Sequence, residues 1–167
     1  MNSVSLMDLK KRALLAAALL AAAALYAAWL WQPARQVRLH TAHFLGAVER
    51  RKWDRVQAFV ADNYSDRWGH DKEFVLREAR EVFRQFLFLT IQSDPAPPTL
   101  AGPDAEIRTP IRLAGDGSPI AQFVVEKVNT LRAPFVFTWH HTGWQPWAWQ
   151  LTRIEQPELE IEMERGF

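Results

Sequence analysis

The side chains that could transfer protons in this chain are few, and they are spread along it. A general base beside a hydroxyl donor would suit proton abstraction next to a carbonyl group. The residues that could supply such a pair are Tyr64, His70, Asp71 and either His140 or His141. Tyr64 and Asp71 also have structural explanations, since a phenol at a helix end often bonds to nearby backbone and an Asp before a helix caps it. We favour these structural roles and predict that the chain has no catalytic residue and is not an enzyme.

Metal and cofactor chemistry finds little support in the sequence. The chain has no cysteine, which excludes disulfides, thiolate nucleophiles and zinc sites with Cys ligands. His140 and His141 are consecutive in a predicted strand, so their side chains point to opposite faces and do not grip one ion together. His40 and His43 could share a helix face, but no carboxylate follows them at a ligand spacing. We therefore expect no metal and no cofactor.

Four tryptophans crowd into eleven residues near the C-terminus: Trp139, Trp144, Trp147 and Trp149. Trp147 and Trp149 differ by two positions, so on a strand they share one face. Such a group could form a platform for a sugar or an aromatic ligand. Packing of large flat rings into a core is the more ordinary explanation, and we favour it.

Near the N-terminus lies a segment of nineteen residues that contains no charged side chain. Residues 13–31 contain ten Ala, six Leu, one Tyr and two Trp, directly after Lys10, Lys11 and Arg12. As a helix this run would extend about 28 Å, close to the thickness of the hydrocarbon core of a bilayer. A cleaved signal peptide has a shorter apolar region, and a core helix of this purity at a chain end would be unusual. We predict an uncleaved transmembrane helix and keep both alternatives open.

The charges on either side of this helix bear on its orientation. The dense triplet before it favours an N-terminus on the cytoplasmic side, by the positive-inside rule. Arg35, Arg38, Arg50 and Arg51 on the far side count against this orientation. We favour export of the domain that follows. In a bacterium the chain would then be a single-pass inner-membrane protein with its C-terminal domain in the periplasm.

The remaining residues predict one α+β domain. Apolar residues recur at helical spacing over about 36–61 and 71–86, and Pro33 fits the first turn of the first of these helices. Runs typical of strands cover 86–92, 105–113, 120–131, 134–141 and 146–154. Helices followed by a meander of strands predict helices packed on one face of an antiparallel sheet.

The chain therefore divides into a cationic tail (1–12), the transmembrane helix (13–31), the α+β domain (32–156) and an acidic tail (157–167). In the tail Glu alternates with Leu159, Ile161 and Met163, which predicts a strand docked within the domain or on a partner's sheet edge. A frayed end is the alternative. Residues 32–84 hold eleven Lys or Arg and eight Asp or Glu, and residues 85–167 hold six and ten. Neither half is basic enough to predict a nucleic-acid surface.

Five local stretches carry a resemblance to a known fold family. They are residues 44–54 (FLGAVERRKWD), 59–64 (FVADNY), 68–72 (WGHDK), the turn Gly143-Trp144, and 149–155 (WQLTRIE). In their order and spacing they resemble the nuclear transport factor 2-like (SnoaL-like) cone fold over about residues 36–156. The resemblance implies a strongly curved sheet that wraps the helices into a cone whose open end is a pocket.

That family includes isomerases, dehydratases and hydrolases as well as non-catalytic binding and assembly modules, so fold does not decide function. Its enzymes place an Asp, Tyr or His in the pocket. The pocket candidates here are Tyr64, Trp68, His70, Asp71, Trp139, His140, Trp147 and Trp149. We expect a membrane-anchored, non-enzymatic module that binds a partner protein or a small ligand, or a homodimer formed through the sheet. The alternative is a small enzyme of the isomerase or dehydratase type.

Overall fold

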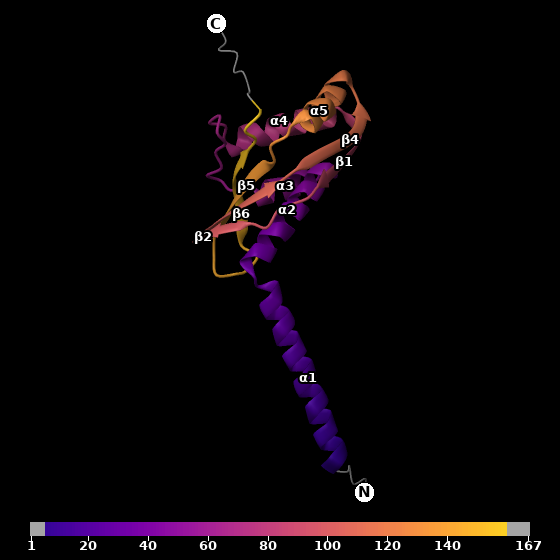
Figure 1. The fold of residues 1–167 in the computed structure, drawn as a ribbon, viewed down its shortest axis with the longest axis vertical. Helices are drawn as coiled ribbons and strands as arrows, with labels where there is room; N and C mark the ends of the chain where they lie inside the picture. The colour runs from indigo at the N-terminus through magenta and orange to yellow at the C-terminus, as the bar shows by residue number, and fades with distance from the viewer. Residues whose placement is uncertain (1–5, 160–167) are drawn as a thin grey trace.

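A long helix projects from a folded domain in the computed structural model, which describes residues 6–159 (Figure 1). This helix, α1 (Leu6–Leu30), contains a stretch from Lys11 to Trp29 with a mean hydropathy of 1.7, none of which is buried. The stretch is long and apolar enough to cross a membrane. Because it is wholly exposed, it is not a core helix of the domain formed by the described residues.

Four further helices lie in the domain: α2 (Pro33–Glu49), α3 (Trp53–Phe59), α4 (Lys72–Arg84) and α5 (Pro119–Thr130). Pro33 opens α2, as the sequence predicts. The single helix predicted over 36–61 is wrong, because the chain turns sharply at Arg51, whose φ is 53°. The Arg51 guanidinium donates hydrogen bonds to the carbonyl oxygens of Phe86 and Leu87, at 2.8 and 3.1 Å. These bonds tie the turn to the first strand.

The strands are β1 (Phe86–Ser93), β2 (Thr99–Ala101), β3 (Asp104–Thr109), β4 (Ile111–Gly117), β5 (Phe135–His141) and β6 (Trp149–Glu155). They form an antiparallel pair β1-β4 and a sheet with the order β2-β3-β5-β6. In the chain, β1 leads to β2 and then returns through β3 to β4. The four strands therefore form one long bent hairpin, which turns at Gly102 with a φ of 61°.

Pro110 is the corner of this hairpin. It separates β3 from β4, so the single strand predicted over 105–113 is wrong. A proline has no backbone N–H to donate to a ladder, and the pairing therefore changes partner at this residue. The Pro110 carbonyl still accepts a hydrogen bond from the Asp94 amide at 3.3 Å.

The strand predicted over 120–131 is also wrong, because these residues form α5. Ser118 caps the helix by accepting a hydrogen bond from the Ala121 amide, and Pro119 occupies the first turn. Ala121 and the valines at 124, 125 and 128 follow the i, i+3, i+4, i+7 pattern and pack against one apolar cluster. Capping and helical spacing override the strand preference of the Phe-Val-Val run.

Asn129 fixes α5 to β4. Its side-chain amide accepts a hydrogen bond from the Leu113 amide at 2.9 Å and donates one to the Leu113 carbonyl at 2.8 Å. The side chain therefore pairs with both backbone groups of one residue, as a neighbouring strand would.

Three residues of the acidic tail lie within the described part of the chain. Pro157 and Glu158 form a turn, and the Glu158 carboxylate accepts hydrogen bonds from the amides of Arg132 and Ala133. The rest of the alternating segment, with Ile161 and Met163, lies outside the described residues, so the docked strand stays a prediction.

We predict that Asn129→Ala lowers the free energy of unfolding by about 1 to 3 kcal/mol. The substitution removes two hydrogen bonds and leaves the Leu113 backbone groups without these partners. Gln122→Ala on the exposed side of the same helix is the matched control, and it should cost less than about 0.5 kcal/mol. Chemical denaturation of the full chain in nanodiscs measures both. Equal effects of the two substitutions would contradict this role of Asn129.

Candidate binding cavity

A cavity of about 270 Å³ lies between the helices and the two sheets. Helices α2 and α3 contribute Phe44, Leu45, Val48, Trp53 and Val56 to its wall, and α4 contributes Val75, Leu76, Ala79 and Phe83. The opposite side comes from α5 and the strands, through Ile91, Ile111, Leu113, Val124, Val128, Phe135, Phe137 and Ile154. These apolar side chains surround a hollow between the helices and the bent sheet.

The wall of this cavity carries no acid or base among the described residues. Trp53 and Tyr64 are the lining residues with a polar atom in the side chain, and no polar surface faces the cavity. Several lining side chains, such as Phe83, Ile111 and Phe135, are half-buried and pack against the buried core. The cavity is therefore suited to an uncharged, apolar group.

Tyr64 lies at one side of the cavity and is buried, with 4% of its surface exposed. Its burial, with a smaller contribution from Asp66, raises the pKa of the phenol above its ordinary value, while a hydrogen bond to the Ile154 backbone opposes the rise. The hydroxyl therefore stays protonated at neutral pH. Its bond to the β6 backbone gives it a structural role.

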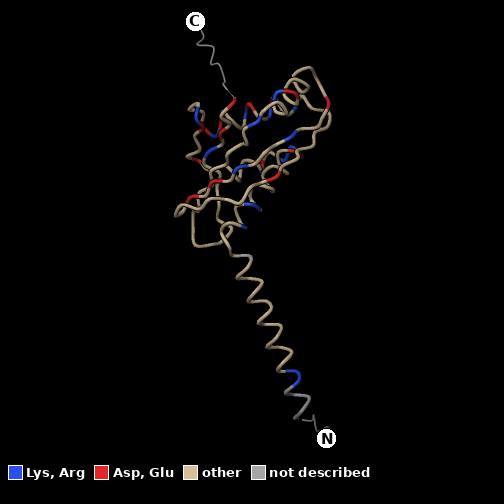
Figure 2. Tube along the Cα trace, in the orientation of Figure 1, with Lys and Arg blue, Asp and Glu red and all other residues tan. Residues whose placement is uncertain are grey.

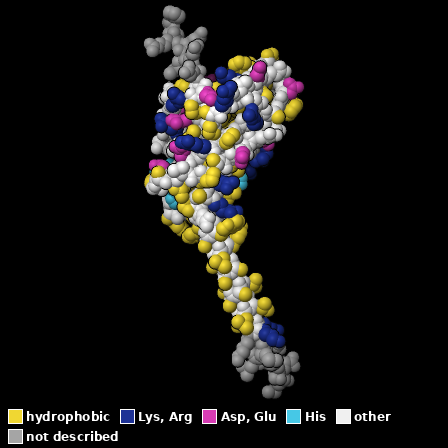
Figure 3. All heavy atoms as spheres, viewed as in Figure 1, with side chains coloured by type: hydrophobic (Ala, Val, Ile, Leu, Met, Phe, Trp, Pro, Cys, Tyr) yellow, Lys and Arg dark blue, Asp and Glu magenta, His cyan; other side chains and the backbone are white. Residues whose placement is uncertain are grey.

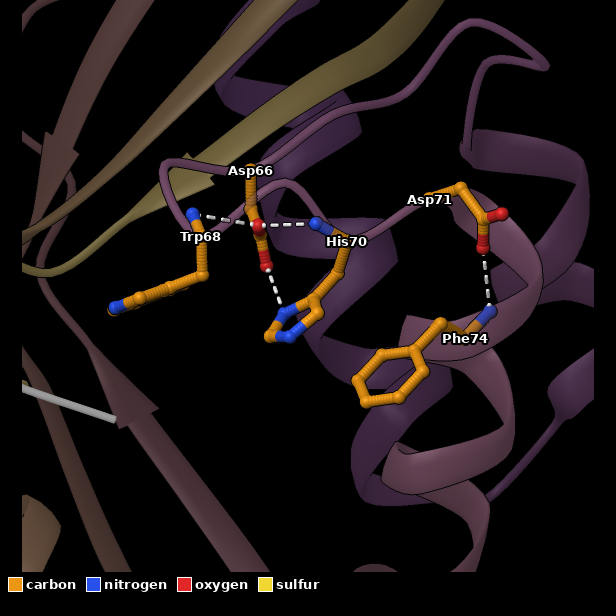
Figure 4. A network of polar contacts seen from close by, with 5 residues as sticks. All are labelled: Asp66, Trp68, His70, Asp71 and Phe74. Atoms are coloured by element: carbon orange, nitrogen blue, oxygen red, sulfur yellow. Dashed lines mark hydrogen bonds and ion pairs between the residues drawn. The ribbon is translucent and has the colours of Figure 1, made fainter. Parts of the chain in front are cut away.

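The carboxylate of Asp66 forms several hydrogen bonds and is a structural hub of its loop, although the sequence did not mark it as a candidate. Its carboxylate accepts hydrogen bonds from the amides of Trp68 and His70, both at 2.9 Å, and contacts the His70 ring nitrogen Nδ1 at 2.9 Å (Figure 4). Only about 5% of its side chain is exposed. Neither Asp66 nor His70 lines the cavity. The pair braces the loop between α3 and α4.

Two other candidates in this loop also have structural contacts. Asp71 caps α4 by accepting a hydrogen bond from the Phe74 amide at 2.8 Å, as predicted (Figure 4). Trp68 lies half-buried and stacks beside the His70 ring, with the ring centres 6.4 Å apart. The other face of His70 is occupied, since the ring stacks on Phe74 at 4.2 Å.

The candidates on β5 lie on opposite sides of that strand. Trp139 is fully buried and contacts the rings of His40, Phe44 and Phe59 edge-on. His140 is partly exposed, and its Nδ1 lies 2.7 Å from a carboxylate oxygen of Asp104. Neither side chain reaches the cavity wall.

The last two candidates lie near the end of the domain where α1 is attached. Trp149 begins β6, is buried, and donates a hydrogen bond from its indole N–H to the Pro146 carbonyl at 3.0 Å. Trp147 precedes the strand and is 55% exposed. Of the eight pocket candidates, Tyr64 alone lines the cavity. In the described residues no group of three His, Asp or Glu side chains is placed to hold a metal.

No known family matches the sequence, and no curated protein does. Solved structures do match the fold. A candidate dehydratase of the nuclear transport factor 2-like family from Streptomyces avermitilis is 18% identical, with a TM-score of 0.54 over 72% of this chain and 91% of that one. A conserved protein from Planctomyces limnophilus is 14% identical, with a TM-score of 0.54 over 71% and 89%.

The Bd1075 protein of Bdellovibrio bacteriovorus, at 10% identity and a TM-score of 0.54, matches 72% of this chain, which spans 40% of that longer protein. At identities this low the likeness concerns fold alone. The domain has the nuclear transport factor 2-like cone fold, with helices packed on a bent antiparallel sheet, as the sequence resemblance implies.

If Asp66 is a structural hub, Asp66→Ala should lower the free energy of unfolding by about 2 to 4 kcal/mol, since it removes three hydrogen bonds at a buried site. Asp71→Ala removes one exposed cap bond and should cost about 1 kcal/mol. Denaturation of the full chain in nanodiscs, followed by near-ultraviolet circular dichroism, compares the two. A larger loss for Asp71→Ala would mean that the hub is misassigned.

Proposed function

We propose that this chain is a membrane-anchored binding module whose cone cavity holds an apolar, single-chain ligand without transforming it. The observation that carries the proposal is the wall of the cavity, which is built from hydrocarbon and aromatic side chains. A proton-transfer reaction needs a base within hydrogen-bond reach of the substrate. The acids and histidines considered above instead have partners outside the cavity.

The size of the cavity supports a ligand larger than one ring. An engineered apolar cavity of about 150 Å³ stays dry and binds benzene. A cavity of about 270 Å³ has room for a longer hydrocarbon group, such as part of an acyl chain. Filling it would restore dispersion contacts that the wall now lacks, and this gain would favour binding.

Helix α1 supports attachment to a membrane. Its apolar stretch is bounded at the N-terminal side by Lys11 and Arg12, and no other described residue of the stretch is charged (Figure 2). Only Trp31 and Gln32 separate α1 from α2, so the domain would be held directly at the membrane surface. The cationic end favours the N-terminus inside and the domain exported.

A dehydratase or isomerase is the second candidate function. Two structural neighbours support it, since the proteins from Streptomyces avermitilis and from Novosphingobium aromaticivorans are named as candidate dehydratases, the second as a scytalone dehydratase. Tyr64 could donate a proton at the cavity edge. The lack of a base in the described cavity wall favours the binding module.

Filling the cavity should block ligand binding. We expect a medium-chain fatty acid bearing a diazirine to label peptides of α4 and α5 when it is photolysed with the full chain in nanodiscs. Ala79→Phe places a ring in the cavity and should reduce this labelling at least several-fold. Ala58→Phe, on the exposed side of α3, adds the same ring outside and should leave the labelling unchanged.

Thermal unfolding checks that Ala79→Phe folds, and its melting temperature should equal or exceed that of the native chain, because the ring enters empty space. Equal labelling of native and Ala79→Phe chains would refute the cavity as the binding site. Turnover of a carbonyl-containing substrate analogue that is lost in Tyr64→Phe would favour the enzyme instead.

Charging the middle of α1 should release the chain from membranes. Leu19→Arg together with Leu20→Arg places two cations at the centre of the apolar stretch, each costing about 2.5 to 3.5 kcal/mol in the bilayer. After alkaline carbonate extraction the native chain should sediment with membranes and the variant should stay in the supernatant. A mature chain whose N-terminus begins after Ala34 would show instead that the segment is a cleaved signal.

A further inference from the structure

Large apolar side chains are displayed at the end of the domain to which α1 is attached. Trp144 is 84% exposed, Trp147 55%, Trp31 54% and Leu100 46%. In the space-filling view, apolar side chains gather where the helix meets the domain (Figure 3). Four large apolar groups exposed together at one end of a small domain mark a surface that contacts something other than water.

These side chains come from three segments that lie side by side. Strand β2 contributes Leu100, the loop between β5 and β6 contributes Trp144, and the α1–α2 junction contributes Trp31. All three line one hollow. In Figure 1 this loop and β2 lie at the α1 end of the domain, whereas α4 and α5 lie at the far end. We call Trp31, Leu100, Trp144 and Trp147 the anchor-end face.

The loop that carries the two tryptophans is braced, so their exposure is built into the fold. The His40 ring nitrogen Nε2 lies 3.0 Å from the Trp147 carbonyl and links the loop to α2. The Thr142 amide donates a hydrogen bond to the Ala148 carbonyl at 2.8 Å, and the His141 Nε2 lies 2.7 Å from the Gln145 carbonyl. The indole of Trp144 is left to project outward.

The charges beside the face suit lipid headgroups. The Arg35 guanidinium lies 3.0 Å from the centre of the Trp29 ring, and Arg35 and Arg38 flank a second hollow beside the proline-rich 95–98 segment. Arginine pairs well with phosphate oxygens. The acid closest in sequence to the β2–β3 turn, Asp104, is paired with His140.

We propose that the anchor-end face lies in the headgroup region of the same bilayer that α1 crosses, so that the domain has a second membrane contact that fixes its orientation. Tryptophan rings favour this region because one part of the ring is apolar and its N–H is polar. A few exposed rings bind a membrane weakly by themselves. Here α1 holds them at a high local concentration of lipid, so a weak contact suffices. The inference rests on the proposed insertion of α1.

The absence of cysteine from the chain allows a direct test, since one introduced cysteine can carry one fluorophore. The reporters are Trp144→Cys on the face, Leu20→Cys within α1, and Leu87→Cys on β1, an exposed site near α5 at the far end. Each full chain is placed in vesicles of phosphatidylethanolamine and phosphatidylglycerol. One set of vesicles contains a lipid with a nitroxide near its headgroup, and a second set contains a lipid with a nitroxide near the end of its acyl chain. We expect the acyl-chain nitroxide to quench position 20 strongly and the headgroup nitroxide to quench position 144 strongly. Neither nitroxide should quench position 87, and position 144 should be protected from aqueous iodide.

Removing the face should release the domain while α1 stays inserted. With the reporter at Leu100→Cys, the double substitution Trp144→Ser and Trp147→Ser should reduce lipid quenching at least several-fold. Ile120→Ser with Phe123→Ser removes two exposed apolar side chains from α5 and should leave the quenching unchanged. Both pairs are exposed, so neither substitution should unfold the domain.

The outcomes separate this inference from the proposed function. Quenching at position 20 without quenching at 144 would show that α1 crosses the bilayer but that the anchor-end face does not contact it. No quenching at position 20 would contradict the insertion of α1, and with it the contact of the anchor-end face with the bilayer. Equal quenching at 144 and 87 would show a domain lying on its side, which also contradicts the inference.

Discussion

The bend of the long hairpin at Pro110 is the constraint on which the rest of this domain depends. A straight ladder would let the helices pack flat on one sheet. Because Pro110 lacks an amide hydrogen, the ladder is interrupted there, and β3 and β4 join different partners. The chain beside the corner stays attached, since the Ala96 amide donates a hydrogen bond to the Arg108 carbonyl at 2.9 Å. The helices then span two sheet segments that diverge, and their apolar side chains enclose a hollow.

The polar contacts of the domain link its helices and loops to the strands, and none of those described faces the cavity. Glu49 at the end of α2 accepts a hydrogen bond from the Ile91 amide at 2.7 Å, next to the bonds of Arg51 to β1. The segment after α3 covers the edge of β6, where the Ala61 amide donates to the Leu151 carbonyl and the Ser65 amide to the Thr152 carbonyl. Two proton-transfer candidates also have such structural contacts, since Asp71 caps α4 and His70 is paired with Asp66 in the loop before it.

The sequence predicts the features that depend on near neighbours in the chain. The Asp71 cap, the first turn at Pro33 and the strands β5 and β6 follow from local residue types and their spacing. The sequence does not predict a turn that is stabilised by residues far away in the chain, such as the turn at Arg51, which bonds to β1. Helix α5 was predictable in principle, since Ser118 and Pro119 form a start signal and the spacing of its valines is helical. The resemblance to the cone fold implies a pocket, but it did not identify the residues that line it. An apolar stripe that lines a hollow has the same composition as one that fills a core.

The position of the cavity restricts the class of ligand that can reach it. Its wall includes α4 and α5, which lie at the end of the domain remote from α1 (Figure 1). With the domain seated on the membrane at its other end, the hydrocarbon of the bilayer would not reach this wall, and a ligand would have to cross water to enter it. The cost of exposing apolar surface grows by about 0.8 kcal/mol for each CH₂ group. A diacyl lipid would pass this step far more slowly than a single short chain, so the geometry favours ligands with one chain and measurable solubility in water.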